Sequence, residues 1–308
     1  MLTPIAPFEP IAVEIPPAGE QWIAQVKWDG VRLLVYHEAG STRLFNRRGN
    51  ERTAHYPELA DARDYCSASS AILDGECIAL HGGKPSFHHV MKRDGLRRMS
   101  GVSRAMGIVP VTYMVFDVLY CDGQWLLDEP LAQRQRLLGQ LLAPQPHVQL
   151  VDSVTDAAAL LNAVTEHGLE GIVCKDRTSL YTLGGKDARW QKRKLQRQLQ
   201  AIVGGVSLRA GAVNALLLGV PDSATGALRY IGRCGSGALD GKRWRALAAE
   251  LLALRSPIRP FDATPPPAPA SSDATLWVRP TIAVRVRYME WTDSGTMRQP
   301  VLLARDGE

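Results

Sequence analysis

Short apolar runs alternate with polar turns along the first two thirds of the chain. Between Trp22 and Tyr36, an apolar run leads into the polar turn Lys27-Trp-Asp-Gly30 and then into a second apolar run, which predicts strand, tight loop and strand. Three further strand-like runs and two segments with helical spacing follow, at Ala71 to Leu80, Val111 to Tyr120, Gly171 to Lys175, Pro130 to Leu142 and Asp156 to His167. These elements predict an α+β domain over residues 1–197.

A different pattern begins near Gln200. Strand-like runs then alternate with glycine turns and one helical stretch, at Ala201 to Val206, Ala215 to Val220, Leu228 to Gly232, Ile282 to Tyr288 and, for the helix, Lys242 to Leu254. A small β-barrel is the simplest closure for such a set. Residues 256–275 hold so many prolines that we expect an extended or irregular surface connection there. The second domain is therefore predicted to span residues 198–308.

Charged residues accompany each of the four apolar runs of the first domain. They are Lys27, Glu76, Asp117, and Glu170 together with Lys175. We expect each of them at a strand end or turn, because a rigid sheet presents side chains to a cleft at its strand ends. The pattern therefore predicts a cleft lined by charged groups.

Length and composition favour a two-domain protein of the cytoplasm. The 308 residues are 45% hydrophobic, which is enough for sizeable cores. The chain has no run of eighteen apolar residues and no basic-then-apolar leader, so we expect neither a membrane span nor export. Its five cysteines are scattered and form no C-x-x-C pair, which argues against a disulfide framework and against structural zinc.

The charge of the chain is concentrated in its C-terminal third. Of the net +5, the part from residue 201 onward carries 13 basic and 9 acidic residues, or +4. A basic surface of this kind fits contact with phosphates, and an arginine-rich domain without such a partner explains the charge equally well. Charge alone leaves both interpretations open.

The sharpest local signal is Lys27-Trp-Asp-Gly-Val-Arg32. A lysine in a strand-end loop can act as a covalent nucleophile, since its amine attacks phosphorus once it is deprotonated. Arg32 would add a second positive charge beside the same phosphate. Because a short Lys-x-Asp-Gly also occurs by chance, in a hairpin with a solvated lysine, the spacing of the later motifs decides between the two.

Five motifs in order resemble the covalent nucleotidyltransferases, in particular the ATP-dependent DNA ligases of bacterial non-homologous end joining. They are Lys27 to Arg32; Phe45-Asn-Arg-Arg-Gly49; Leu73-Asp-Gly-Glu76; Tyr113-Met-Val-Phe-Asp117; and Glu170-Gly-Ile-Val-Cys-Lys175 followed by Trp190-Gln-Lys-Arg-Lys194. One such match is weak, but the ordered set is specific and covers nearly the whole chain. The resemblance implies an α+β nucleotidyltransferase (adenylation) domain with antiparallel sheets, followed by an all-β OB-fold domain.

The same resemblance implies an ATP-dependent DNA ligase that seals nicks or broken ends. Lys27 would attack the α-phosphate of ATP, release pyrophosphate and hold AMP through a phosphoramide bond. AMP would then pass to the 5′-phosphate of DNA, where the 3′-hydroxyl displaces it. The implied cofactors are ATP and Mg²⁺ or Mn²⁺, and the implied setting is DNA repair or end joining by a monomer in the bacterial cytosol or nucleoid, with DNA and an end-binding repair protein as partners.

Further contacts around Lys27 follow from the resemblance, and each suits its chemistry. Guanidinium forks match phosphate oxygens, carboxylates match Mg²⁺, an aromatic ring can stack on a base, and amines stabilise developing phosphate charge. The implied residues are Gln25 and Val26 beside adenine, Arg32 and Arg47 on ribose and phosphates, Glu76 and Glu170 on ribose and metal, Phe116 stacked on adenine, and Lys192 with Lys194 on the α-phosphate and leaving group. Without the resemblance, Phe116 in its apolar run is an ordinary core residue.

The C-terminal domain resembles the ligase OB-fold in three stretches, Trp277-Val-Arg-Pro280, Tyr288-Met-Glu-Trp291 and Arg298-Gln-Pro300. In that family the domain swings to close over ATP and then over DNA. Arg298 and Arg305 are the implied DNA or triphosphate contacts, and an ordinary surface arginine is the alternative for each. We interpret the glycine-rich stretch Gly232 to Gly237 as a barrel turn rather than a nucleotide loop.

The chain departs from the family pattern at two places. Gln25 stands where the family usually has a glutamate that reads the adenine amino group, and a glutamine carbonyl can still accept that hydrogen bond. The family commonly ends this region with Arg-x-Asp-Lys, whereas this sequence reads Arg305-Asp-Gly-Glu308. Since that stretch helps to orient pyrophosphate, we expect slow self-adenylation.

Other functions share part of this pattern. RNA ligases and mRNA capping guanylyltransferases also use Lys-x-Asp-Gly, but the Trp190 to Lys194 stretch and the Trp277 and Arg298 segments look more like a DNA ligase. The altered C-terminus also motivates an alternative from another class, a catalytically silent DNA-end-binding module.

Overall fold

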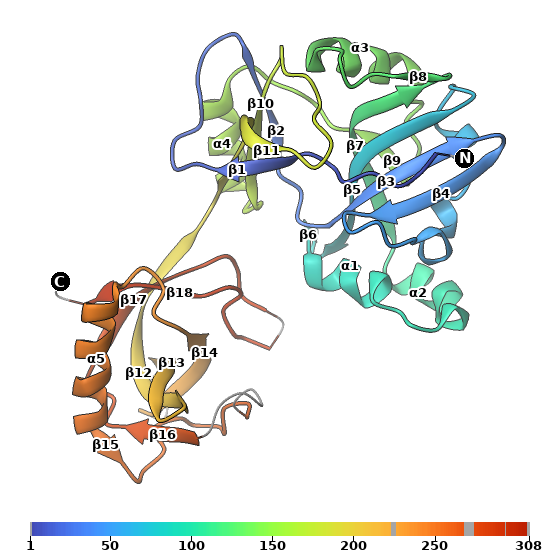
Figure 1. The fold of residues 1–308 in the computed structure, drawn as a ribbon. Helices are drawn as coiled ribbons and strands as arrows, with labels where there is room; N and C mark the ends of the chain where they lie inside the picture. The colour runs from blue at the N-terminus through green and yellow to red at the C-terminus, as the bar shows by residue number, and fades with distance from the viewer. Residues whose placement is uncertain (1, 223–225, 268–273, 293, 307–308) are drawn as a thin grey trace. The chain divides into compact units, whose positions relative to one another are not determined.

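The computed structural model describes residues 2–222, 226–267, 274–292 and 294–306. The chain forms two compact units, Met1–Leu195 and Gln196–Glu308 (Figure 1). Each unit has its own buried apolar core. Among the described residues, no helix is both long and apolar enough to cross a membrane.

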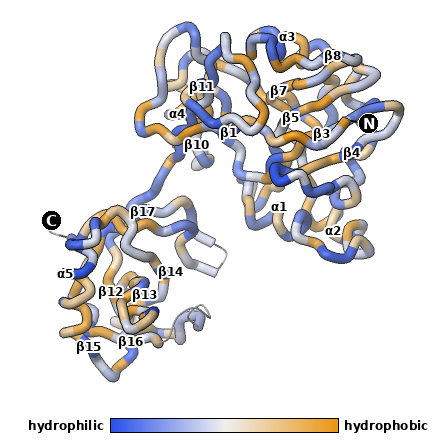
Figure 2. Tube along the Cα trace, viewed as in Figure 1, coloured by the Kyte–Doolittle hydropathy of each residue, from blue (hydrophilic) through white to orange (hydrophobic). Residues whose placement is uncertain are grey.

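A large sheet forms the centre of the first unit. Its strands run in the order β4-β3-β5-β7-β8, with β6 paired to β5 and β9 paired in parallel to β7. Alternation along each strand buries both faces, so that Leu33 and Val35 enter one core cluster while Leu34 and Tyr36 enter another. Hydrophobic residues accordingly run along β3, β5 and β7 (Figure 2). The bounds are β3 Val31–Glu38, β4 Ser41–Asn46, β5 Ala71–His81, β6 Lys84–Pro85, β7 Val111–Cys121, β8 Gln124–Trp125 and β9 Val148–Leu150.

A second, four-stranded sheet of this unit has the order β1-β11-β10-β2. Its bounds are β1 Glu9–Ala12, β2 Trp22–Val26, β10 Gly171–Asp176 and β11 Lys186–Lys194. Helix α4 (Ala157–Glu166) covers one face, where Val164 packs with Ala24 and Ile172. The opposite face carries Gln25, Val173, Lys175, Trp190 and Lys192, which all line one pocket.

Two helices of the first unit were predicted from spacing and two were not. Helices α3 (Leu131–Leu141) and α4 lie inside the predicted segments. Helices α1 (Phe87–Asp94) and α2 (Val102–Ile108) arise from a polar stretch, where the Ser86 hydroxyl caps α1 by accepting a bond from the backbone N–H of His89. Short 3-10 turns complete the unit at Thr53–His55, Pro57–Leu59, Ala62–Asp64 and Met99–Gly101.

The expectation that the charged groups lie at strand ends was wrong for two of them. Lys27 follows β2, Glu170 precedes β10 and Lys175 is the last residue but one of β10, as expected. Glu76 and Asp117, however, lie in the interior of their strands. The reason is that β5 and β7 are each 11 residues long and continue past their carboxylates. These side chains therefore project from the face of a sheet rather than from its edge.

The second unit is a strongly curved β-structure built on β12 (Arg197–Arg209). The first half of β12 pairs with β17, and its second half pairs with β16. The change of partner falls at Gly204, where the pairing with the strand on the other side shifts register and where a Cβ would lie 2.5 Å from the Phe261 ring. The remaining bounds are β13 Ala212–Pro221, β14 Leu228–Cys234, α5 Gly241–Ala253, β15 Arg255–Ser256, β16 Ala274–Val278, β17 Ala283–Tyr288 and β18 Val301–Arg305.

Two predictions for this unit can be compared with the structure, and a third falls partly outside the described residues. The proline-rich connection is irregular where it is described, although residues 268–273 lie outside the described part and β16 begins at Ala274. The predicted glycine turn begins inside β14, where Gly232 has a φ of +133°. Of the C-terminal stretch, residues 307–308 also lie outside the described part.

Candidate active site

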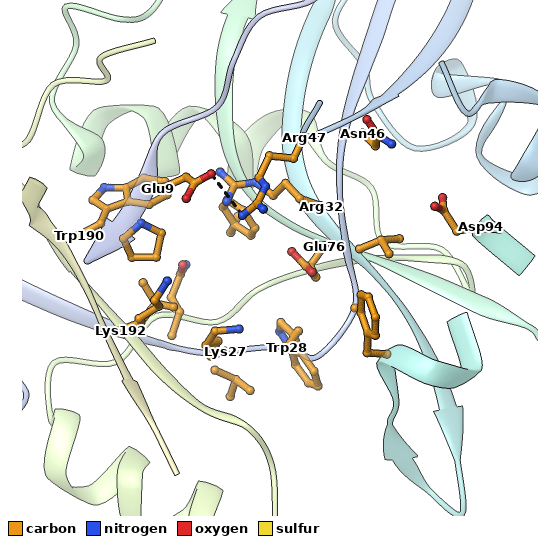
Figure 3. A pocket seen from close by; sticks show the side chains of 18 of the residues that line it. Glu9, Lys27, Trp28, Arg32, Asn46, Arg47, Glu76, Asp94, Trp190 and Lys192 are labelled. Atoms are coloured by element: carbon orange, nitrogen blue, oxygen red, sulfur yellow. Dashed lines mark ion pairs between the residues drawn. The ribbon is translucent and has the colours of Figure 1, made fainter. Parts of the chain in front are cut away.

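A pocket of about 520 Å³ lies between the two sheets of the first unit (Figure 3). It brings together eight of the residues that the sequence singled out: Gln25, Val26, Lys27, Arg32, Arg47, Glu76, Phe116 and Lys192. Glu170 and Lys194 do not line the pocket themselves. Glu170 forms an ion pair with Lys27, and Lys194 forms an ion pair with Glu170. The pocket carries more cationic than anionic side chains, which suits an anionic ligand.

Lys27 lies just beyond the end of β2. Its backbone N–H donates to the carbonyl of Gly171 at 2.9 Å, and its Nζ donates to Glu170 Oε2 at 2.5 Å. Strands β10 and β11 of the four-stranded sheet approach closely here because Gly171, with a φ of +149°, has no Cβ. A Cβ at this position would lie 2.1 Å from the Arg193 carbonyl oxygen. The pairing of β10 with β2 on its other side places Glu170 beside Lys27.

Glu170 is buried between two ammonium groups. Besides Lys27, it accepts from Lys194 Nζ, which lies 2.9 Å from its Oε1. Burial alone would raise the pKa of this carboxyl, but the positive charges of Lys27 and Lys194 outweigh burial and hold its pKa below the usual value. Glu170 is therefore ionised at neutral pH.

Arg32 is held in place by Asp74. Its Nε and an Nη donate to the two carboxylate oxygens at 2.5 and 2.6 Å, and the Tyr181 hydroxyl donates to the same carboxylate at 2.9 Å. The guanidinium carbon also lies 4.6 Å from the centre of the Phe116 ring. Asp74 was not among the sequence candidates, although it belongs to the Leu73-Asp-Gly-Glu76 motif.

Arg47 forms an ion pair with Glu9, whose Oε1 lies 3.2 Å from Nη1 (Figure 3). Both side chains line the pocket, and the Arg47 side chain is largely exposed. The N-terminal segment thus contributes a carboxylate to the site. Sequence patterns gave no signal for Glu9, because its place depends on the parallel pairing of β1 with β11.

Glu76 projects from the middle of β5 into the pocket. Burial raises its pKa to about 7, although the positive charges of Lys27 and Arg32 oppose the shift. A cation bound beside it would favour the ionised form. Among the described residues, however, no group of three or more His, Cys, Asp or Glu side chains is arranged to hold a metal by itself.

Phe116, Trp190 and Lys175 form a compact group at the deep end of the pocket. The Lys175 Nζ lies 4.0 Å from the centre of each ring, and the side chain is only 2% exposed. Within the described part of the chain this ammonium has no hydrogen-bond partner. Burial lowers the pKa of Lys175 to about 7. In the sequence, Lys175 stands out only as the single charged residue of the apolar run Gly171 to Lys175.

Gln25 and Lys192 complete the floor of the pocket. Gln25 is 2% exposed, and its Nε2 donates to the Ser153 hydroxyl at 3.0 Å. Lys192 lies on the same strand face as Trp190, as the alternate spacing predicted. Burial, together with the nearby charges of Lys27 and Lys194, lowers the pKa of Lys192.

Arg298 and Arg305 belong to the second unit. Arg298 Nη1 lies 2.7 Å from Glu290 Oε1, and Arg305 Nη2 lies 2.7 Å from Glu250 Oε1. Both are thus engaged in ion pairs within their own unit.

Comparisons with known proteins agree with this geometry. The family model "ATP dependent DNA ligase domain" matches residues 8–194, and "ATP dependent DNA ligase C terminal region" matches residues 209–306. The multifunctional non-homologous end joining DNA repair protein LigD of Mycobacterium tuberculosis is 34% identical over 287 residues, which are 91% of this chain and 35% of that protein. The chain thus spans about a third of the length of such curated relatives.

Solved structures give the same result. The structure of mycobacterial DNA ligase D complexed with ATP and MES is 32% identical with a TM-score of 0.53, over 98% of this chain and 94% of that one. The ligase domain of M. tuberculosis LigD is 31% identical with the same TM-score and the same coverage. Since the first family model alone spans more than half of the residues, this chain belongs to the ATP-dependent DNA ligase family.

Proposed function

We propose that this chain is an ATP-dependent DNA ligase that forms a covalent lysyl-AMP intermediate on Lys27. The observation that carries the proposal is the position of the Lys27 amine in a cationic pocket, 2.5 Å from Glu170 and facing Arg32 and Lys192. A triphosphate with its α-phosphorus beside Nζ would have its negative charge compensated by these groups. Family membership supplies the reaction class.

The proposed reaction has three displacements at phosphorus. The Lys27 amine attacks only after it loses its proton, and Glu170 already accepts a hydrogen bond from it. Attack forms the N–P bond, breaks the bond to the β-phosphate oxygen and releases pyrophosphate. The 5′-phosphate of DNA then takes AMP from the lysine, and the 3′-hydroxyl finally displaces AMP to leave a phosphodiester.

The other pocket residues are assigned by their chemistry. Arg32 and Arg47 bind ribose or phosphate oxygens, Phe116 supplies a face for adenine, and Lys192 with Lys194 stabilises the α-phosphate and the leaving group. Gln25 and Val26 border the base. Arg47 must exchange its ion pair with Glu9 for a phosphate. The Arg47 side chain is exposed and Glu9 is partly exposed, so the pair is weak and easily exchanged.

Mg²⁺ fits this pocket as an ion shared with the nucleotide. Mg²⁺ is commonly bound by one or two carboxylates together with substrate phosphates, so a cage of three protein ligands is not required. Glu76 is suitable because burial disfavours its charge until a cation balances it. Glu170, which accepts from both Lys27 and Lys194, becomes available when Lys27 loses its proton. The ion would neutralise charge on the reacting phosphates.

The second unit is proposed to bind DNA as an OB-fold domain over residues 198–308. Its excess of basic residues suits a phosphate backbone, and Arg298 and Arg305 are the proposed contacts. We further propose that the protein acts as a monomer in end joining or another DNA repair route, together with an end-binding partner protein. A nicked DNA duplex compared with a nicked RNA duplex in the same sealing assay separates the two polymers.

The direct test is adduct formation. The protein is incubated with Mg²⁺ and ATP or GTP labelled at the α-phosphate, and the products are run on a denaturing gel. We expect a labelled band with ATP that disappears in Lys27→Ala and persists in Lys84→Ala, which changes an exposed lysine of β6. A band with GTP alone would indicate a guanylyltransferase. The absence of any band, with DNA-end binding retained, would indicate a silent end-binding module.

A further inference from the structure

Gln25 lines the part of the pocket where the proposed nucleotide base would lie, and its neighbours determine which hydrogen bonds it can form with that base. Gln25 lies two residues before Lys27 on the same side of β2, roughly 6–7 Å along the strand. It lines the pocket together with Phe116. A nucleotide with its α-phosphate at Lys27 and its ring against Phe116 therefore directs the edge of its base toward Gln25.

The two ends of a glutamine amide have opposite hydrogen-bonding character. Oε1 only accepts and Nε2 only donates. Adenine presents an amino group, a donor, at its six position, whereas guanine presents an acceptor oxygen there. The end of the Gln25 amide that faces the pocket therefore distinguishes ATP from GTP.

A chain of hydrogen bonds behind Gln25 sets this orientation. Gln25 Nε2 donates to Ser153 Oγ at 3.0 Å, and Ser153 Oγ donates to Gln135 Oε1 at 3.4 Å. A hydroxyl has one proton to donate, so while that proton goes to Gln135 the Ser153 oxygen must accept from Gln25. Among the described residues the Gln25 side chain makes no other hydrogen bond, which leaves Oε1 for the base.

Backbone hydrogen bonds hold the residues of this chain of side-chain bonds next to one another. Ala24 and Val154 exchange two backbone hydrogen bonds of 2.7 and 3.0 Å, which keep Ser153 next to Gln25. Gln135 comes from α3, and with Ser153 it lines a second cavity of about 370 Å³. Phe116 lines both cavities. The chain of bonds thus runs beside the ring against which the base is proposed to stack.

We propose that Ser153 and Gln135 are positioning residues that select ATP over GTP by fixing which end of the Gln25 amide faces the base. This inference rests on the proposed function and deepens it. The direction of the chain is reversible in principle, because an amide and a hydroxyl each both donate and accept. A residue at position 135 that only donates would send the Ser153 proton to Gln25 Oε1 and turn Nε2 toward the base.

Two substitutions of opposite character test the direction. In Gln135→Glu, the carboxylate can only accept a hydrogen bond from Ser153, so the direction of the hydrogen bonds from Gln25 through Ser153 is preserved. The preference of this variant for ATP over GTP should therefore equal or exceed that of the wild type. Gln135→Lys only donates and reverses the direction, so the preference should fall about tenfold or more, as expected for one mismatched hydrogen bond. Ser153→Ala breaks the chain and should give an intermediate preference.

Matched controls lie on the same helix. Gln133 is exposed on α3, and Gln133→Glu and Gln133→Lys introduce the same charges without reaching Ser153. Both should keep the wild-type ratio. The readout is the ratio of kcat/KM for adduct formation with labelled ATP and with labelled GTP, paired with the ratio of equilibrium affinities of the two nucleotides from dialysis.

The outcomes separate the two proposals. Equal ATP-to-GTP ratios in Gln135→Glu, Gln135→Lys and wild type would overturn the positioning role, whether read from adducts or from binding. Selective binding of ATP without any adduct would overturn the proposed reaction and leave the positioning role supported or refuted by the binding ratios. If neither ATP nor GTP bound to the folded protein, both proposals would be overturned.

Discussion

Asp74 shows how a residue without direct contact to a ligand can determine the shape of the site. Its carboxylate is completely buried and holds Arg32 through two hydrogen bonds, with Tyr181 as a third partner. Arg32 in turn packs over the ring of Phe116. The position of a predicted phosphate contact therefore depends on a carboxylate that sequence motifs assign no chemical role.

Substitution of Asp74 should damage both stability and reaction. In Asp74→Asn the Arg32 charge remains buried without its counter-ion, so the free energy of unfolding should fall by about 3 kcal/mol, and adduct formation should slow. Urea unfolding followed by fluorescence measures the first effect and the gel assay the second. Asp61→Asn, which removes an ion pair with Arg63 at the exposed surface, is the control and should change neither. Equal behaviour of the two variants would contradict this account.

Lys175 makes the stability of the first unit depend on pH. Burial lowers its pKa from the ordinary value of 10.5 to about 7, with the carboxylates of Asp117 and Asp74 opposing the shift and the guanidinium groups of Arg32 and Arg134 adding to it. Between these two values the unfolded chain holds the proton and the folded chain does not. The free energy of unfolding therefore rises with pH in this interval, and the destabilisation is complete below pH 7.

The variant Lys175→Met should consequently be stabilised most below pH 7. Its advantage over the wild type should shrink as the pH rises from 7 towards 10.5, because the buried wild-type lysine is by then neutral. Urea unfolding at a series of pH values measures the difference, and Lys84→Met, at an exposed lysine, should show no such trend. A difference between Lys175→Met and wild type that stays constant with pH would refute the buried-charge explanation.

At the scale of elements, β10 lies between β2 and β11 in one sheet, and its close approach to β11 helps to place Glu170 between Lys27 and Lys194. The approach depends on Gly171, whose conformation and missing Cβ allow the backbone of Arg193 to come near. Glu170 then lies at the start of β10 and faces Lys27, at the end of β2, across the same sheet.

Gly171→Ala should force these strands apart. A Cβ only 2.1 Å from a backbone oxygen cannot be accommodated by a side-chain rotation, so we expect a loss of about 1–3 kcal/mol in the free energy of unfolding and much slower adduct formation. Gly107→Ala is the matched control, since a Cβ in α2 would meet nothing within 4 Å. An active, fully stable Gly171→Ala variant would show that the glycine is dispensable.

At the scale of the whole molecule, the two units keep separate cores. Leu33, Val35 and Leu73 lie in a cluster of the first unit, whereas Leu218 and Leu251 lie in the cluster of the second. Separate cores allow separate unfolding, since each unit buries its own apolar surface.

A cavity in one core should therefore destabilise one unit. Leu251→Ala in α5 should lower the stability of the second unit by about 2–5 kcal/mol. Hydrogen exchange read by mass spectrometry should then speed up in β12 to β14 and remain unchanged in β3 to β7, and Leu33→Ala should give the reverse pattern. Faster exchange throughout the chain in either variant would indicate one cooperative body.

Local pattern determined much of this protein. Short continuous apolar runs predicted β2, β3, β5, β7, β10 and most strands of the second unit, because strands that are buried on both faces carry apolar residues at nearly every position. The ordered motifs, and the resemblance that they support, also picked out eight residues that line one pocket, six of them within the motifs themselves. Helices α1 and α2 were missed because they are only 8 and 7 residues long and α1 consists mostly of polar and charged residues, so neither gives a long apolar repeat.

The partners of each site residue were decided only by the tertiary structure. Glu9 reaches Arg47, and Ser153 reaches Gln25, through strand pairings between segments far apart in the chain, and periodicity contains no information about such pairings. The same holds for Lys175, whose charge is isolated between two rings from different strands. Sequence alone determined which chemical groups are present and on which face of each strand they lie. Long-range packing decided which of them meet, because those contacts depend on how the two sheets are brought together.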